Sequence, residues 1–170
     1  AQHIAEALAT NATLTSLNML NSWLTEEGAR ALVAVAEFKP NQIKSPCGIG
    51  ADATAVDFSE QGLDAADAVL LASELRTNAT MTGLNLRGNE FYCESAQHIA
   101  EALKANATLT QLDLYQNFLD AVGAQHIAEA LKVNATVTQL NLRHHDFDDT
   151  SKVLLREAWR HGSGLNLDSY

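Results

Sequence analysis

The sequence predicts an α/β solenoid, a curved stack of similar units that each contribute one helix and one strand. Three observations predict it: the segment AQHIAEAL occurs three times, its apolar residues have helical spacing, and the apolar residues that follow alternate as in a strand. A length of 170 residues suits one domain, so we expect a single domain over 1–170. We expect a right-handed β/α stack with a parallel sheet on the concave face and helices on the convex face.

The repeat has a constant 28-residue period, with one exception. The aligned positions are Ala1, Ala29, Ala68, Ala96, Ala124 and Lys152. Only the step from Ala29 to Ala68 is longer than the others. The sequence therefore predicts six units, with an irregular longer repeat at about 29–67 and its insertion within 38–53.

The first half of each unit reads as an amphipathic helix. Ala96, Ile99, Ala100 and Leu103 lie at i, i+3, i+4 and i+7, which is one face of a helix. Residues that commonly cap helix N-termini precede these segments: Thr25, Asp64, Asp120 and Asp148. Asparagines follow them, where a left-handed residue often ends a helix: Asn11, Asn78, Asn106 and Asn134.

The second half reads as a short strand. The pattern L-x-x-L-x-L-x-x-N-x-L is complete at Leu109, Leu112, Leu114, Asn117 and Leu119. Alternation places Leu112 and Leu114 on one face of the strand and its polar neighbours on the other. One amphipathic helix cannot bury its apolar face alone, so the units must stack. Helices pack about 8–10 Å apart and strands about 4.8 Å apart, so the stack bends towards the sheet.

This pattern is that of leucine-rich repeats, and the segment from Gly123 to Leu142 resembles the ribonuclease-inhibitor class. That class also occurs in NOD-like receptors and the Ran GTPase-activating protein. The resemblance implies a scaffold or recognition domain that binds another protein through the concave sheet and adjoining loops. Two alternatives remain open: a regulator of a small GTPase, and a structural subunit of a larger assembly. For the GTPase regulator, the residues that would contact the GTPase are Asp57, Arg87, Asp113 and Arg143.

The polar positions of successive strands should form three columns across the concave face. The first comprises Ser16, Ala55, Gly83, Gln111 and Gln139. The second comprises Asn18, Asp57, Asn85, Asp113 and Asn141, and the third Leu20, Ser59, Arg87, Tyr115 and Arg143. Arg and Tyr are enriched at interface hot spots. The predicted partner-binding residues are Asn85, Arg87, Asp113, Tyr115, Asn141 and Arg143.

The ends of the chain and the insertion give further expectations. The chain begins inside a helix with Ile4 and Leu8, which predicts the C-terminal part of a longer chain, with further repeats or self-association at this helix. Residues of about 149–170, with Trp159 and a strand at 165–167, read as a cap. Ser45 lies one repeat period after Leu17, so we favour an extra strand there over a bulging loop.

Composition excludes several function classes. A formal net charge of −10, with no run of Lys or Arg, predicts no nucleic-acid partner. No apolar stretch is long enough for a membrane helix, so we expect no membrane partner. Two cysteines without paired spacing indicate free thiols and a cytoplasmic protein.

No residue pattern indicates catalysis, a cofactor or a metal site, so we expect no enzyme. His3, His98 and His126 recur in register and should face solvent as repeat residues, since ligands of one zinc ion must lie much closer together. The residues from His144 to Asp149 include types that bind metals, but they are adjacent and lack the i, i+4 or paired spacing of metal ligands. Asp148 is better interpreted as a helix N-cap. Four Asn-Ala-Thr segments satisfy the glycosylation sequon, but the repeat itself accounts for them.

Overall fold

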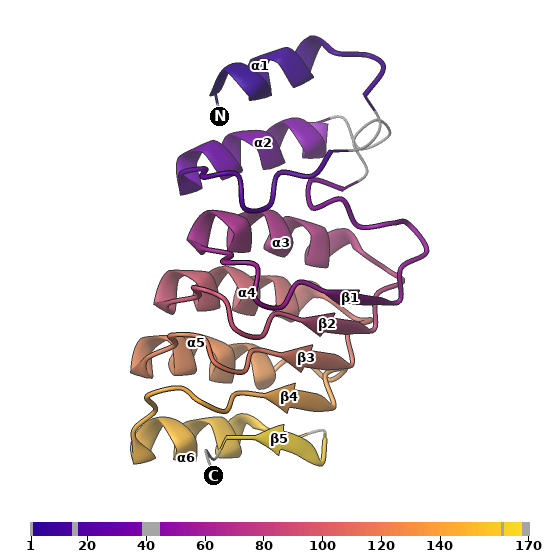
Figure 1. Cartoon of the computed structure of the whole chain (residues 1–170). Coiled ribbons are helices and arrows are strands. Elements are labelled where there is room, and N and C mark those ends of the chain that lie inside the picture. Colours follow the sequence, from indigo (N-terminus) through magenta and orange to yellow (C-terminus); the bar gives the residue numbers. More distant parts are fainter. Residues whose placement is uncertain (1, 15–16, 39–44, 161, 168–170) are drawn as a thin grey trace.

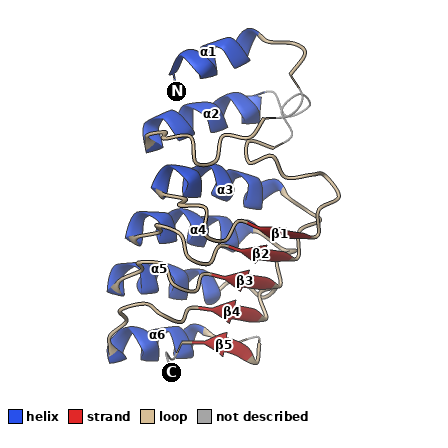
Figure 2. Ribbon diagram, viewed as in Figure 1, coloured by secondary structure: helices blue, strands red, loops and turns tan. Residues whose placement is uncertain are grey.

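The computed structural model describes residues 2–14, 17–38, 45–160 and 162–167. The helices in these residues are α1 (Gln2–Thr10), α2 (Glu26–Phe38), α3 (Ala65–Thr77), α4 (Cys93–Ala105), α5 (Ala121–Leu131) and α6 (Asp149–Ala158). The strands are β1 (Ala55–Asp57), β2 (Gly83–Asn85), β3 (Gln111–Asp113), β4 (Gln139–Asn141) and β5 (Gly164–Asn166). The helices stack in one layer and the strands in a second layer beside them (Figure 1, Figure 2). The predicted α/β solenoid is confirmed.

The sheet is parallel, with strand order β1-β2-β3-β4-β5. Its register follows the repeat period, because Val56 pairs with Leu84, Leu84 with Leu112 and Leu112 with Leu140. Leu140 then pairs with Leu165, which follows it by slightly less than one period. A single column of apolar residues therefore runs under the whole sheet.

The strands expected in the first unit and at Ser45 are wrong within the described residues. Asn18 and Cys47 form an isolated antiparallel bridge instead, and the amide of Met19 donates to the carbonyl of Pro46 (3.0 Å). The hydroxyl of Ser45 accepts from the amides of Cys47 and Ile49, which folds this segment back on itself. Gly48 then turns the chain with φ +70°, a conformation that glycine adopts without strain. The parallel sheet consequently begins at β1. Expectations on Ser16 and on residues 39–44 fall outside the described residues.

The core lies between the two layers. Leu84, Leu112 and Leu140 are buried beneath the sheet, and Ile99 and Leu103 of α4 are buried opposite them. Alanines on the inner faces of the helices are also buried, which allows close packing of the helices on the sheet. In the part of the chain that the structure describes, no helix is long and apolar enough to cross a membrane.

The predicted helix N-caps are confirmed. The hydroxyl of Thr25 accepts from the amide of Gly28 (3.1 Å). Asp64, Asp120 and Asp148 likewise accept backbone amides in the first turns of α3, α5 and α6. Tyr92 occupies the same position before α4 but makes no capping hydrogen bond. One unit therefore lacks the cap that its neighbours have.

The left-handed conformation predicted for the helix-ending asparagines is wrong. Asn78 and Asn106 have φ of −72° and −76°, in the extended region. The Oδ1 of Asn106 accepts from the amides of Thr108 and Leu109, and its Nδ2 donates to the carbonyl of Leu75 in the preceding unit (2.7 Å). The asparagine therefore turns its own chain and ties two units together. Left-handed residues instead follow the strands, at Glu60, Gly88, Gln116 and His144.

A second set of ties lies at the Asn position of the repeat, below the ends of the strands. Asn117 Nδ2 donates to the carbonyls of Leu86 and Leu114 (both 3.0 Å). His145 takes this position in the next unit, with Nε2 at 2.9 Å from the carbonyl oxygen of Leu114. Its Nδ1 lies 2.9 Å from the carbonyl oxygen of Asn117. A neutral imidazole has one N–H, so it can donate to only one of these carbonyls.

The replacement His145→Asn should make stability less dependent on pH. Burial lowers the pKa of His145 below its ordinary value, so the unfolded chain takes up a proton more readily than the native chain. The contribution of His145 to stability is thus fully present above about pH 6.5 and is lost as the pH falls below it. Denaturant unfolding of both proteins between about pH 8 and 5 measures this effect.

Comparison with the variant isolates His145 from other titrating groups. Burial raises the pKa values of the carboxyl groups of Asp67 and Glu74, so their protonation favours the native chain as the pH falls. Both groups remain in the variant. We expect the variant to gain stability relative to the original chain at low pH, and parallel pH curves would contradict this role of His145.

Candidate functional site

The strands present an open groove on the concave face, with a volume of about 590 Å³. All five strands line it, and the register of the repeat places the predicted columns side by side as expected. β5 extends the first column with Gly164 and the second with Asn166. The predicted members Asn18 and Leu20 precede the sheet and do not join its ladder.

The first column forms the floor of the groove. Ala55, Gly83 and Gly164 place little or no side-chain volume in it, and the side chains of Gln111 and Gln139 are exposed. A Cβ atom added at Gly83 would lie 3.7 Å from the Cβ atom of Ala55, which is ordinary van der Waals contact. The sheet therefore has room for a Cβ atom at Gly83, and a side chain attached there would project from the floor of the groove.

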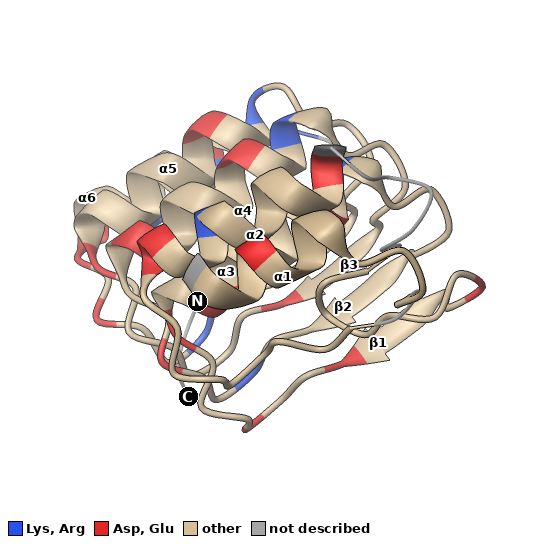
Figure 3. Ribbon diagram, turned by 90° about the horizontal axis from the view of Figure 1, so that it is seen from above, with Lys and Arg blue, Asp and Glu red and all other residues tan. Residues whose placement is uncertain are grey.

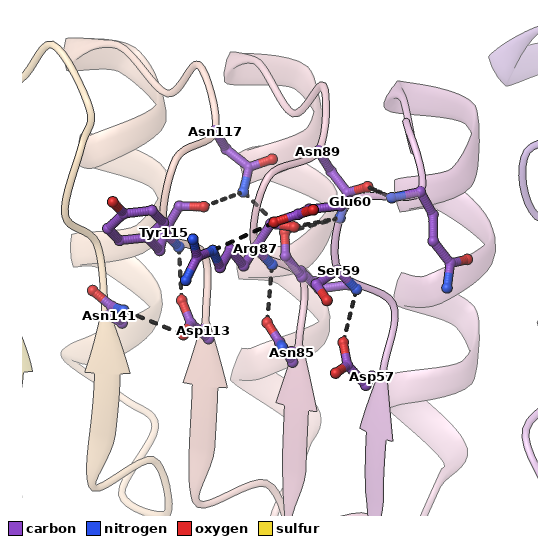
Figure 4. Close-up of polar contacts among 12 residues, drawn as sticks. Asp57, Ser59, Glu60, Asn85, Arg87, Asn89, Asp113, Tyr115, Asn117 and Asn141 are labelled. Atoms are coloured by element: carbon purple, nitrogen blue, oxygen red, sulfur yellow. Dashed lines mark hydrogen bonds and ion pairs between the residues drawn. The ribbon is translucent and has the colours of Figure 1, made fainter.

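Hydrogen bonds from backbone amides orient the side chains of the second column. In each of Asp57, Asn85, Asp113 and Asn141, Oδ1 accepts from the amide of the residue two positions later (2.8–3.3 Å). Asn141 Nδ2 also donates to Asp113 Oδ2 at 3.2 Å (Figure 4). Hydrogen bonds from Ser59, and then from Asn85, lower the pKa of Asp57. The alternation of Asp and Asn keeps carboxylates from lying on adjacent strands, where they would repel one another.

The third column places Arg87 against Tyr115 just beyond the strand ends (Figure 4). The guanidinium carbon of Arg87 lies 4.5 Å from the centre of the Tyr115 ring, a cation–π contact. Arg87 Nε is also 3.9 Å from a carboxylate oxygen of Glu60. On its other side the Tyr115 ring contacts the His144 ring, with centroids 4.7 Å apart. Arg143 follows β4 in the same column, and its amide donates to Asn141.

Sequence reasoning missed Glu60 and His144 as neighbours of this column. Both have positive φ, at 56° and 59°, and this conformation follows β1, β2, β3 and β4 at the same repeat position. In the sequence His144 belongs to a run of metal-ligand residue types, although its position after Arg143 could have placed it beside Tyr115. Among the described residues, no group of three His, Cys, Asp or Glu side chains could hold a metal ion.

Two of the repeated histidines differ in exposure. His3 is exposed, as predicted, with 99% of its side chain accessible. The prediction is wrong for His98, whose side chain is only 23% exposed and whose Nε2 lies 3.2 Å from Glu26 Oε2. This contact joins α4 to the start of α2, and sequence spacing alone could not reveal it. Neither cysteine forms a disulfide, and burial raises the pKa of Cys47 well above its ordinary value.

Comparison with known proteins agrees with the architecture. A family model described as "Leucine Rich repeat" matches residues 10–33 and 133–151. The actin-binding site 2 of leiomodin-1 is a similar solved structure, with a TM-score of 0.55 and 23% identity over 92% of this chain and 85% of that one. The tropomodulin C-terminal domain of Caenorhabditis elegans has a TM-score of 0.52 and 14% identity over 92% and 89%. The chain has the leucine-rich-repeat fold. No curated protein sequence matches it.

In this fold, the predicted site residues occupy two different environments. Asn85, Asp113 and Asn141 line the groove, and the Oδ1 of each already accepts from the amide of the residue two positions later. Arg87 and Tyr115 form a contact pair at the strand ends, with Arg143 in the next unit. The second column therefore lines the groove with polar side chains of fixed orientation, and Tyr115 adds a large amphipathic side chain near the strand ends.

Proposed function

We propose that this chain is a protein-interaction domain that binds its partner through the concave groove and the row formed by Arg87, Tyr115 and Arg143. The observation that carries the proposal is the groove itself, about 590 Å³ in volume and lined by all five strands. The leucine-rich-repeat fold supports it, since solenoids commonly use concave surfaces for binding. The 28-residue repeat is our reason for proposing the ribonuclease-inhibitor-like class.

Preorganisation favours binding at this face. The side chains of the second column are held by backbone hydrogen bonds, and Arg87 is held by Tyr115 and Glu60. Side chains that are already ordered lose less conformational entropy when a partner binds. Tyr and Arg side chains also contribute disproportionately to interface energy. We therefore propose Asn85, Arg87, Asp113, Tyr115, Asn141 and Arg143 as the contact residues.

Two kinds of partner can be tested first. One of the similar structures is an actin-binding site, so actin is one candidate. Small GTPases are the other, because the repeat resembles that of a GTPase activator. Stimulated nucleotide hydrolysis would assign a regulator, whereas a stable complex without it would assign a scaffold or a structural subunit. A net charge of −10 disfavours nucleic acid as the partner.

The variants Tyr115→Ala and Gly83→Trp should both weaken binding of the partner. Tyr115→Ala should cost about 2 kcal/mol or more of binding free energy, because it removes the central side chain of the row. Gly83→Trp should weaken binding by at least about tenfold, because it fills the groove while the fold tolerates a Cβ atom at that position. Titration calorimetry with actin, with small GTPases and with any partner isolated by affinity purification measures both effects.

Val133→Trp is the matched control, because Val133 is 64% exposed, follows α5 and does not line the groove. Stability should change by less than about 0.5 kcal/mol in Gly83→Trp and by about 1 kcal/mol in Tyr115→Ala, which loses its contact with Arg87. If Val133→Trp abolishes binding while both groove variants retain it, the partner binds elsewhere and the proposed contact residues are wrong.

A further inference from the structure

Two aromatic side chains lie stacked on the surface where loops lead into α4 and α5. The ring centroids of Tyr92 and Phe118 are 5.2 Å apart, with an interplanar angle of 14°. Tyr92 is 51% exposed and Phe118 57% exposed, and Val122 in the first turn of α5 is 51% exposed. None of the three lines the concave groove. A solvated cluster of large apolar side chains of this kind commonly marks a contact surface.

The repeat itself does not account for this pair. Tyr92 stands where the other units have Thr25, Asp64, Asp120 and Asp148, each of which caps its helix. Tyr92 makes no capping bond, so α4 forgoes the stabilisation that a cap provides. Phe118 stands where the preceding unit has the exposed residue Glu90. Both aromatics therefore stand at surface positions that other units fill with polar residues, and Tyr92 leaves α4 without a side-chain cap.

The backbone holds the two rings in place. The amide of Phe118 donates to the carbonyl of Phe91 (2.8 Å), and the amide of Phe91 donates to Oδ1 of the buried Asn117 (3.3 Å). Tyr92 directly follows Phe91, whose side chain is fully buried. The backbone that carries the stacked pair, which forms the platform, is thus anchored to the core of the repeat, which lowers the entropic cost of binding.

Exposed acidic residues lie close to the platform in the sequence. Glu90, Glu94 and Asp120 are all exposed, and the hydrogen bond to Glu94 is the main cause of the raised pKa of the Cys93 thiol, which follows Tyr92. Neither residues 88–103 nor residues 116–131 contain Lys or Arg. Acidic positions also outnumber basic ones over the whole ribbon (Figure 3). An exposed apolar platform flanked in the sequence by carboxylates complements a partner that is apolar and positively charged.

We propose that Tyr92 and Phe118, together with Glu90 and Glu94, form a second docking site for a basic segment of a partner protein, in which an apolar side chain is flanked by Lys or Arg. The apolar side chain rests on the stacked rings. The flanking cations face the carboxylates. This site is separate from the concave groove, and it stands or falls independently of the proposed function.

The test uses the full chain and a short fluorescent amphipathic peptide of Lys and Leu, with Lys/Ser and Glu/Leu peptides of equal length as matched probes. We expect Phe118→Ser and Tyr92→Ser each to weaken binding of the Lys/Leu peptide by at least about tenfold in fluorescence anisotropy. Replacing Glu90 and Glu94 together by Gln should weaken binding and reduce its dependence on salt. Gly83→Trp should leave binding unchanged, which separates this site from the groove.

Stability distinguishes loss of the site from loss of the fold. Serine is a good N-cap, so the unfolding midpoint of Tyr92→Ser should equal or exceed that of the original chain while its peptide affinity falls. Equal binding of the Lys/Leu peptide by the Ser variants, or equal binding of the Glu/Leu or Lys/Ser peptide by the original chain, would overturn the proposal. So would a dimer in sedimentation that Phe118→Ser dissociates, because the platform would then belong to a second copy.

Discussion

Replacing Leu112 by Ala is expected to lower the free energy of unfolding by about 2–5 kcal/mol. Leu112 is 2% exposed and lies at the centre of the sheet, paired with Leu84 on one side and Leu140 on the other. Truncation leaves a cavity that neither neighbouring unit can fill, because both are tied to β3 by backbone hydrogen bonds. Urea denaturation followed by circular dichroism measures the loss.

Val133→Ala is the control for Leu112→Ala, because it also removes aliphatic carbons but at a side chain that is 64% exposed. Its cost should be below about 0.5 kcal/mol. A similar small cost for Leu112→Ala would mean that Leu112 does not face the core and that the sheet has another register.

Replacing Asn134 by Ala is expected to cost about 2–4 kcal/mol, although no large apolar side chain is lost. Asn134 is 6% exposed, and its side chain makes four hydrogen bonds to backbone groups. Its Nδ2 donates to the carbonyls of Leu103 (2.8 Å) and Asn106 (3.1 Å), and its Oδ1 accepts from the amides of Thr136 and Val137. Alanine leaves these buried backbone groups without partners, which costs more than the bonds themselves contribute.

The matched control is Asn11→Ala, at the equivalent position of the first unit. Asn11 Oδ1 accepts from the amides of Thr13 and Leu14, but these bonds lie near the surface, where water can replace it. We expect a loss of about 0.5–1 kcal/mol. Equal losses for Asn11→Ala and Asn134→Ala in the same urea titration would show that the ties between units contribute little to stability.

Periodicity accounts for the parts of the fold that could be predicted. The constant spacing of the repeat specifies which residues are neighbours on adjacent strands, and the structure pairs Gly83 with Gln111 and Asn85 with Asp113 accordingly. The alternation of Leu112 with polar neighbours specifies which face of the sheet is buried. The helix caps at Asp64 and Asp120 are local features, so their residue types sufficed to predict them.

Contacts that depend on three-dimensional detail could not be predicted in this way. The segment with the insertion contains a strand-like position at Ser45, yet its hydroxyl folds the backbone back through two local hydrogen bonds. The residue type of the helix-ending asparagines predicts a left-handed backbone at the end of the helix. Asn106 instead donates a hydrogen bond from its side chain to the carbonyl of Leu75 in the preceding unit. Only an arrangement of whole units brings these partners within hydrogen-bonding distance.

The candidate sites divide in the same way. Periodicity was enough to predict the solenoid, the columns and the position of Tyr115 in its column, because a repeat with a constant period places each residue beside its counterpart in the next unit. The contacts of Arg87 and His144 with the Tyr115 ring, and the stacking of Tyr92 on Phe118, are visible only in the folded chain. These contacts depend on loop conformation and side-chain packing, which no periodicity encodes.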